Sequence, residues 1–212
     1  MTIVNLYKKN RCFPWVSLAV VLACFLVTGI AVARPELYES LAWSKYPVYP
    51  WQYVSGAFLH GTGGDLPLTV MHLVANLLMF LPYAVLLEGM LGHKKFGLVF
   101  LASWLGISLV FQGFAWLAVP AGEAAYGAGL SGSSYAVIAM GAYVLFCLFR
   151  RNKGRFFRQP LAYVFLSGLL GEVLILLPMV AGIGSMVIHL AGIFIGAIMT
   201  FLYRSTLRAA ME

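Results

Sequence analysis

Six long apolar stretches constrain this 212-residue chain more than any other feature of its sequence. A helix that crosses a membrane needs about 20 consecutive apolar residues, because the hydrocarbon core is about 30 Å thick and a helix rises about 1.5 Å per residue. The stretches lie near 14–33, 69–91, 96–118, 128–149, 161–180 and 185–203. The sequence therefore predicts an all-α polytopic membrane protein, with six transmembrane helices in a single domain over residues 1–212.

The composition excludes an ordinary soluble domain. Hydrophobic residues make up 62% of the chain and charged residues 10%, whereas soluble domains carry about 25% charged residues. A soluble protein of this size could not bury so much apolar surface. The net charge of +7 could still indicate nucleic-acid binding, so its meaning depends on where the basic residues lie.

Lysine and arginine residues fall almost entirely on one side of the predicted spans. Such residues concentrate in cytoplasmic loops, so we expect both termini in the cytoplasm and the loop 34–68 outside. The net positive charge is then explained by the orientation of the protein in the membrane. We therefore expect contacts with membrane lipids and none with nucleic acid. The twelve residues on the cytoplasmic side are Lys8, Lys9, Arg11, Lys94, Lys95, Arg150, Arg151, Lys153, Arg155, Arg158, Arg204 and Arg208, against Arg34 and Lys45 on the other side.

Few polar groups remain at membrane depth, and each is a candidate functional residue because burying it in a bilayer is costly. His72 and Asn76 lie four residues apart in the second span, so they share one helix face. Ser131 lies in the fourth span and His189 in the sixth. Counted at about 1.5 Å per residue from the cytoplasmic ends, all four reach the outer half of the membrane. We expect them at one level, whereas Glu172 in the fifth span has no evident partner.

Glycines flank Ser131 and share a helical face with His189. A glycine on each side of the serine lets the chain turn tightly and a substrate approach. Glycines three and seven residues after His189 allow a neighbouring backbone to come close. If the fourth and sixth spans pack there, Ser131 and His189 come within hydrogen-bond reach, as a nucleophile and its base require. Packing alone would also account for each residue taken singly. The glycines are Gly129, Gly132, Gly192 and Gly196.

The residue inventory narrows the possible proteolytic chemistry to a serine nucleophile. Catalysis by two aspartates is excluded, because Asp65 is the only aspartate. The His-Glu-x-x-His motif of zinc proteases is absent, since Leu-Val-Ala-Asn follows His72. The three cysteines show no metal-binding spacing, so we expect no metal ion and no cofactor. A Ser–His dyad without a carboxylate needs another group to hold the imidazole, and Tyr135 lies one turn after Ser131.

In this order, the motifs resemble those of the rhomboid family of intramembrane serine proteases, in its minimal six-helix bacterial form. The resemblance covers about Trp51 to Gly196 and rests on His72-x-x-x-Asn76, Gly129-Leu130-Ser131-Gly132, Tyr135 and His189-x-x-Gly192-x-x-x-Gly196. It implies that Ser131 is the nucleophile and His189 the general base, with Tyr135 packed on the base. The oxyanion hole would consist of the His72 and Asn76 side chains and the Ser131 N–H.

The resemblance also implies substrates that are transmembrane proteins, and a bacterial inner membrane with the active site opening to the outer side. The chain departs from the family at three places, one of them in the second span, where Val85-Leu86-Leu87 replaces the small residue often found before the acidic residue. The family commonly has a Trp-Arg pair in the outer loop, and this chain has Trp51-Gln52 instead. The loop must then be anchored without that arginine. The segment Gly61–Pro67 looks like an insertion before the second span.

Two other functions stay open. Glu172, His72 and His189 could form the proton or ion path of a transporter. A non-catalytic rhomboid relative could instead bind membrane proteins, although such relatives usually lack the serine or the histidine. The sequence indicates no oligomeric state.

Two further ionisable residues are expected to serve structure. Glu88 lies near the inner end of the second span, where it could pair with Lys94 or Lys95. His60 is expected to cap the outer loop.

Overall fold

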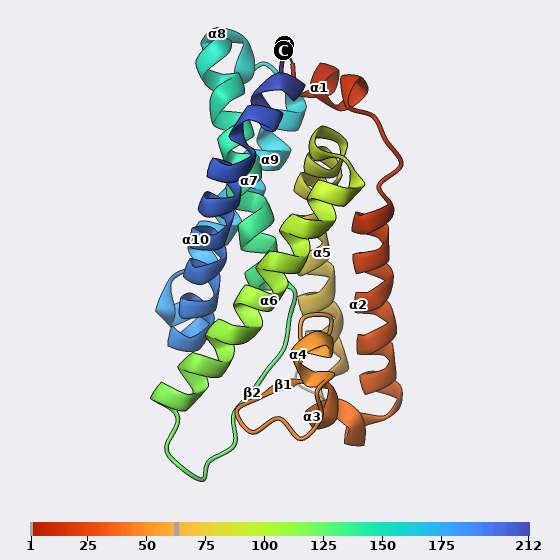
Figure 1. Cartoon of the computed structure of the whole chain (residues 1–212), viewed down its shortest axis with the longest axis vertical. Helices are drawn as coiled ribbons and strands as arrows, with labels where there is room; N and C mark the ends of the chain where they lie inside the picture. Colours follow the sequence, from red (N-terminus) through yellow and green to blue (C-terminus); the bar gives the residue numbers. More distant parts are fainter. Residues whose placement is uncertain (1, 62–63) are drawn as a thin grey trace.

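The computed structural model describes residues 2–61 and 64–212, with the backbone alone for residues 172 and 178–181. Helices dominate it, and a pair of two-residue strands completes it (Figure 1). The elements are α1 (Ile3–Lys9), α2 (Trp15–Ala33), η1 (Pro35–Leu37), α3 (Tyr38–Leu41), β1 (Trp43–Ser44), α4 (Gln52–Ser55), α5 (Leu66–Leu91), α6 (His93–Ala118), β2 (Tyr126–Gly127), α7 (Ser131–Arg151), α8 (Lys153–Phe156), α9 (Pro160–Ile175) and α10 (Pro178–Ala210).

Among the described residues, five helices are long and apolar enough to cross a membrane: α2, α5, α6, α7 and the part of α10 from Gly182 onward. The predicted span 161–180 corresponds to α9, which has 16 residues and falls short of the length of about 20 that a span needs. The helical conformation is interrupted before α10, because the backbone of Leu177 is extended. Helix α10 itself is kinked at Gly182, where φ is 79°. A sixth span therefore stays a prediction.

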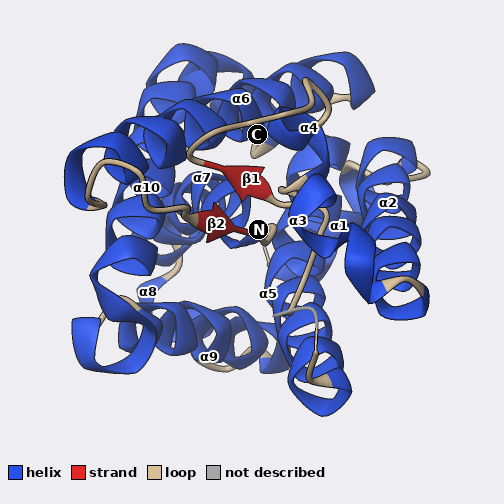
Figure 2. Ribbon diagram, turned by 90° about the horizontal axis from the view of Figure 1, so that it is seen from below, coloured by secondary structure: helices blue, strands red, loops and turns tan. Residues whose placement is uncertain are grey.

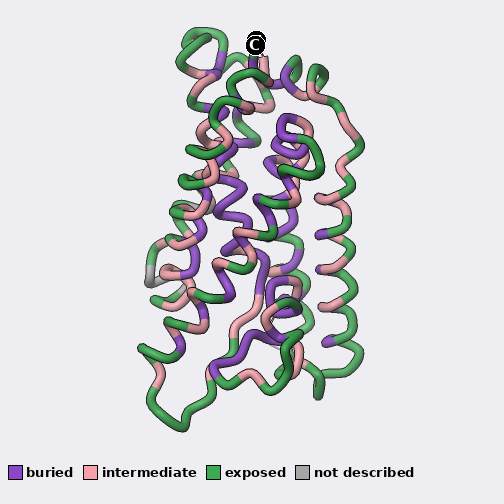
Figure 3. Tube along the Cα trace, in the orientation of Figure 1, coloured by how far each residue is buried: buried purple, intermediate pink, exposed green. Residues whose placement is uncertain are grey.

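Helix α7 lies at the centre of the bundle, with α5, α6, α9 and α10 around it (Figure 2). Most of its residues are buried, whereas α2 lies at the periphery and packs mainly on α5 (Figure 3). Large apolar side chains point outward from the other helices, with Leu22 and Leu109 68% exposed and Phe194 67% exposed. Apolar surface of this extent suits a lipid environment and confirms a helical membrane fold.

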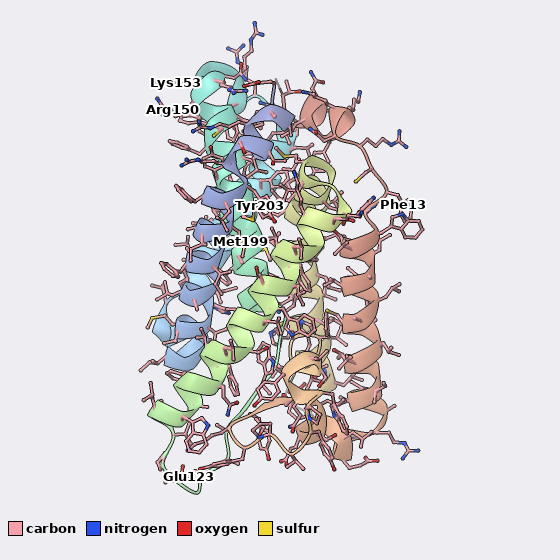
Figure 4. All side chains as sticks on the ribbon, in the orientation of Figure 1. Phe13, Glu123, Arg150, Lys153, Met199 and Tyr203 are labelled. Atoms are coloured by element: carbon pink, nitrogen blue, oxygen red, sulfur yellow. The ribbon has the colours of Figure 1, made fainter. Side chains whose placement is uncertain are left out.

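Basic side chains gather at the end of the molecule that holds α1, α8 and the C-terminus. Figure 4 shows Arg150 and Lys153 there and Glu123 at the opposite end. The two chain ends meet at this basic end, since Asn10 Nδ2 donates to the Ala210 carbonyl at 3.2 Å. This clustering agrees with the charge pattern on which the predicted orientation rests.

The loop between α2 and α5 contains η1, α3 and α4, and it also contributes β1 to a short strand pair that the sequence did not indicate. Strand β1 pairs with β2 in antiparallel register, with Trp43 opposite Gly127 and Ser44 opposite Tyr126. The fully buried Lys45 follows β1, and its Nζ donates to the carbonyls of Val119 and Pro120 at 2.8 Å each. These carbonyls directly follow the last residue of α6, where the negative end of the helix dipole favours a cation.

Gln52 anchors the same loop from the place where the family commonly has arginine. Its Oε1 accepts from the backbone N–H groups of Val48 and Tyr49 at 2.8 and 2.9 Å. Its Nε2 donates to the carbonyls of Glu39 and Ala42 at 2.9 and 3.1 Å. A buried neutral amide thus forms hydrogen bonds with four backbone groups. The loop is therefore anchored even though glutamine stands in place of arginine.

We expect Gln52→Ala to lower the free energy of unfolding by about 2 kcal/mol, because buried backbone groups lose their partners. Thermal unfolding of the purified protein in detergent measures the change. Gln159→Ala, at an amide on the basic end, serves as a comparison outside the loop. Equal stability of Gln52→Ala and the wild type would contradict the anchoring role.

Glu88 holds the N-terminus of α2 and does not form the predicted ion pair with Lys94 or Lys95. Its carboxylate accepts from the backbone N–H groups of Val16 and Ser17 at 2.8 Å each and from the Ser17 hydroxyl at 2.6 Å. His93 Nδ1 lies 2.7 Å from Oε1, the carboxylate oxygen that accepts from the Val16 N–H. The first N–H groups of a helix have no partners within it, and Pro14 at the N-cap has no side chain that could accept them.

Candidate active site

Ser131 and His189 meet between α7 and α10. Ser131 is the first residue of α7, and its Oγ lies 2.9 Å from Nε2 of His189 in α10. The two residues are 58 positions apart in the chain. The predicted juxtaposition is therefore present in the structure, with the distance that a nucleophile and its base require.

The His189 ring is held by stacking. The Tyr135 ring lies 4.3 Å from it, centroid to centroid, at an interplanar angle of 19°. The Nδ1 atom of His189 is buried without a hydrogen-bond partner among the described residues. In a Ser-His-Asp triad a carboxylate would accept from this nitrogen. The described site has no carboxylate there, so the imidazole is oriented by packing against Tyr135.

Small residues let α7 and α10 approach closely enough for this contact. A Cβ added to Gly192 would collide with the carbonyl oxygen of Gly132 and lie 2.9 Å from the Tyr135 Cβ. A Cβ on Gly196 would lie 2.8 Å from the Cα of Ala136. The glycine face predicted from the sequence thus packs directly on α7, next to the stacked rings.

Gly129 shapes the turn before Ser131. Its φ is 132°, a conformation that other residues rarely adopt. The turn is tied to the outer loop at two points, because the Gly129 N–H donates to the Gly56 carbonyl at 2.9 Å and the Leu130 N–H to His60 Nε2 at 3.4 Å. The helix begins at Ser131, so its first N–H groups have no partners within the helix.

His72 faces this turn from α5. The Gly61 N–H donates to its Nδ1 at 3.3 Å, which makes Nδ1 the acceptor and leaves the ring proton of the neutral imidazole on Nε2. That nitrogen lies 3.6 Å from the position of a Cβ on Gly129, and the Ser131 Oγ lies 3.8 Å from the same position. The Nε2–H donor of His72 and the Ser131 hydroxyl therefore lie close to the same point beside Gly129.

Asn76 lies one turn further along α5 and is largely buried. Its Nδ2 donates one hydrogen to the His72 carbonyl at 2.9 Å. The amide has two N–H groups, of which this bond uses one. The i,i+4 pair therefore lies on the helix face that the sequence predicted.

A cavity of about 440 Å³ opens onto the Ser–His pair. Its lining combines polar and apolar groups, from the dyad to Trp43, Tyr126 and Gly127 at the end with the strand pair. The site is therefore reached from the end of the molecule opposite the basic cluster. Among the described residues, no group of three or more His, Cys, Asp or Glu side chains could hold a metal ion.

His60 is the residue whose importance the sequence reasoning missed. It was expected to cap the outer loop, but it is 1% exposed and supports the turn before Ser131. Its Nδ1 lies 3.1 Å from the Phe58 carbonyl, and its ring lies 5.2 Å from that of His72. The sequence feature that could have indicated this role is the position of His60 directly after the apolar residues Phe58 and Leu59. The side chain of Glu172 and the residues 62–63 of the predicted insertion lie outside the described residues.

Burial lowers the pKa of His60 to about 4, and the nearby His72 acts in the same direction. The neutral ring accepts from the Leu130 N–H, whereas a protonated ring would present a second donor to it. The unfolded chain, with a histidine pKa of about 6.5, takes up the proton first, so stability present above pH 6.5 is lost as the pH falls toward 4.

We expect the free energy of unfolding to fall by about 2 kcal/mol between pH 7 and pH 5 through His60. Unfolding in detergent at the two pH values measures this. His60→Gln can still accept from the Leu130 N–H but does not titrate, so it should show a smaller fall. An identical fall in His60→Gln would assign the pH dependence to other groups.

Fold and site together define a helical membrane protein with a serine–histidine pair in a cavity at one end of its bundle. A family model, the Rhomboid domain, matches residues 48–206. This range covers most of the chain and includes all the motif residues, so the chain belongs to the rhomboid family. A comparison with curated proteins found no match.

Proposed function

We propose that this protein is an intramembrane serine endopeptidase that hydrolyses peptide bonds in or near the transmembrane segments of membrane proteins. The observation that carries the proposal is the 2.9 Å contact between Ser131 Oγ and His189 Nε2 at the floor of a partly polar cavity. Non-catalytic relatives usually lack one of these two residues, and both are in place here. No cofactor is required by this chemistry.

The mechanism uses the groups around that contact. Ser131 Oγ attacks the scissile carbonyl while His189 Nε2 takes its proton, which forms a tetrahedral intermediate. The Ser131 N–H and the side-chain N–H groups of His72 and Asn76 donate to its oxyanion. His189 then passes the proton to the leaving amine, and an acyl-enzyme on Ser131 remains. His189 then takes a proton from a water molecule as this water attacks the ester, and it returns the proton to Ser131 Oγ as the second product leaves.

Hydrolysis needs water in a site that lipid surrounds, and the cavity supplies a route for it. The proposed arrangement has six spans in a single domain, with both termini in the cytoplasm and the cavity opening to the outer face of a bacterial inner membrane. Support comes from the basic end, which holds the termini and lies opposite β2 (Figures 1 and 4), whose residues Tyr126 and Gly127 line the cavity.

Labelling with a fluorophosphonate tests the proposal. The purified protein should form a covalent adduct at Ser131, located by peptide mass spectrometry, because the reagent reacts with an activated serine. His189→Ala should fold and lose the label, since the serine is no longer deprotonated. A folded wild-type protein that takes no label at Ser131 would contradict the proposal and favour a binding role. Nothing in the described site favours a transporter.

A further inference from the structure

An apolar hollow lies away from the dyad, between α7, α9 and α10. It has a volume of about 460 Å³ and an almost entirely apolar lining. A second hollow of about 250 Å³ lies closer to the basic end, between α7, α8 and α9. Both are lined by Ala142 and Leu169, so they adjoin. We call the two together the lateral groove.

The outer end of the lateral groove reaches the active site. Tyr135 lines it, and the same ring stacks on His189, which contacts Ser131. An occupant of the groove would therefore contact the side chain that holds the imidazole in place. The cavity that opens onto the dyad is separate and more polar, so substrate and occupant would use different openings.

The inner end of the groove carries positive charge. The Arg150 guanidinium lies 5.9 Å from the centre of the Phe146 ring, which lines the groove. Arg208 Nε donates to the hydroxyl of Tyr143, which also lines it, at 3.0 Å. Among the described residues, neither arginine forms an ion pair with an acid. The segment 150–158 adds further basic residues and no acid.

The length of the groove fits a lipid chain. Tyr135 and Arg150 are 15 residues apart on α7, which corresponds to about 22 Å along the helix. Half of a bilayer with its headgroups is of about the same thickness. A transmembrane helix is about 10–12 Å wide with its side chains, too wide for hollows of these volumes over that length.

We propose that the lateral groove binds an anionic phospholipid of the inner leaflet. The phosphate lies at Arg150 and Arg208, and an acyl chain fills the groove up to Tyr135. Filling an apolar cavity restores dispersion contacts that its lining lacks, so the bound chain stabilises the Tyr135 ring against His189. Building on the proposed protease function, the lipid is then an activator that acts through a positioning residue.

Native mass spectrometry and kinetics on the full chain test this. The protein is reconstituted in phosphatidylcholine vesicles with or without phosphatidylglycerol, then released in mild detergent. We expect retained phosphatidylglycerol, and a several-fold higher kcat for a transmembrane reporter when it is present. Ala142→Phe, which fills the groove, and the double variant Arg150→Gln/Arg208→Gln should each retain at least about 10-fold less. Lys8→Gln/Lys9→Gln, with the same charge change on α1, should retain the lipid as the wild type does.

Lipid retention is read without catalysis, so the two proposals can fail separately. Retention that depends on the groove variants in a protein that cleaves nothing would support the lipid site and overturn the protease function. Equal retention by the wild type and the exposed Arg150→Gln/Arg208→Gln variant would overturn the lipid site, whether or not Ala142→Phe folds. Loss of retention in Lys8→Gln/Lys9→Gln as well would assign binding to general charge and overturn it too.

Discussion

Ser131→Ala is expected to abolish cleavage of a transmembrane reporter, with kcat reduced by about 10⁴-fold or more, to background. The hydroxyl is the proposed nucleophile, and its oxygen lies 2.9 Å from His189 Nε2. Because the substitution removes one oxygen from the edge of a cavity, the thermal stability of the variant should stay within about 1 kcal/mol of the wild type. Cleavage is measured by gel or fluorescence in proteoliposomes.

Ser133→Ala is the matched control. Ser133 lies two residues further along α7, and its hydroxyl is buried without a hydrogen-bond partner among the described residues. Its removal should leave the rate of cleavage within about 2-fold of the wild type, because no interaction is lost. Full activity in Ser131→Ala, or equal loss in both variants, would contradict the role of Ser131.

Glu88→Ala is expected to lower the free energy of unfolding by about 3–5 kcal/mol, the largest effect on stability that we predict. The carboxylate accepts from two backbone N–H groups and one hydroxyl at the start of α2. Without it these donors are left unpaired, and α2 loses the main polar tie to α5. Unfolding followed by tryptophan fluorescence during titration with sodium dodecyl sulfate measures the loss.

Two further variants distinguish the loss of the Glu88 hydrogen bonds to α2 from a general effect of removing a negative charge. Glu88→Gln keeps one acceptor oxygen, so its loss should be about half as large. Glu36→Ala removes an acid from an exposed pair with Arg34, and its effect should be below about 0.5 kcal/mol. A loss in Glu88→Ala no larger than in Glu36→Ala would rule out the proposed tie.

Much of the site could be predicted because its residues share simple local patterns. The spacing of His72 and Asn76, the glycines around Ser131 and the glycine face of His189 follow from helix geometry. A depth count along each span then places them at one level. The catalytic roles stay predictions, but the contact of Ser131 with His189 and the stack of Tyr135 are present in the structure.

Other features could not be read from local patterns. His60 reaches Leu130 across 70 positions and Glu88 reaches Ser17 across 71. From the charges in the sequence, Glu88 is expected to form an ion pair with Lys94 or Lys95. The structure instead uses the carboxylate where a buried helix terminus leaves N–H groups unpaired. In the same way a neutral Gln52 suffices for the outer loop, because its partners are backbone groups rather than a counter-charge.

The sequence by itself determined the membrane class, the approximate position of five spans and the asymmetry of charge, because hydropathy and charge are properties of contiguous segments. The tertiary structure decided which polar atoms meet, how short α9 is and where the lateral groove runs. These depend on how closely helices distant in the chain approach one another, and side-chain volume at glycine positions such as Gly192 sets that distance.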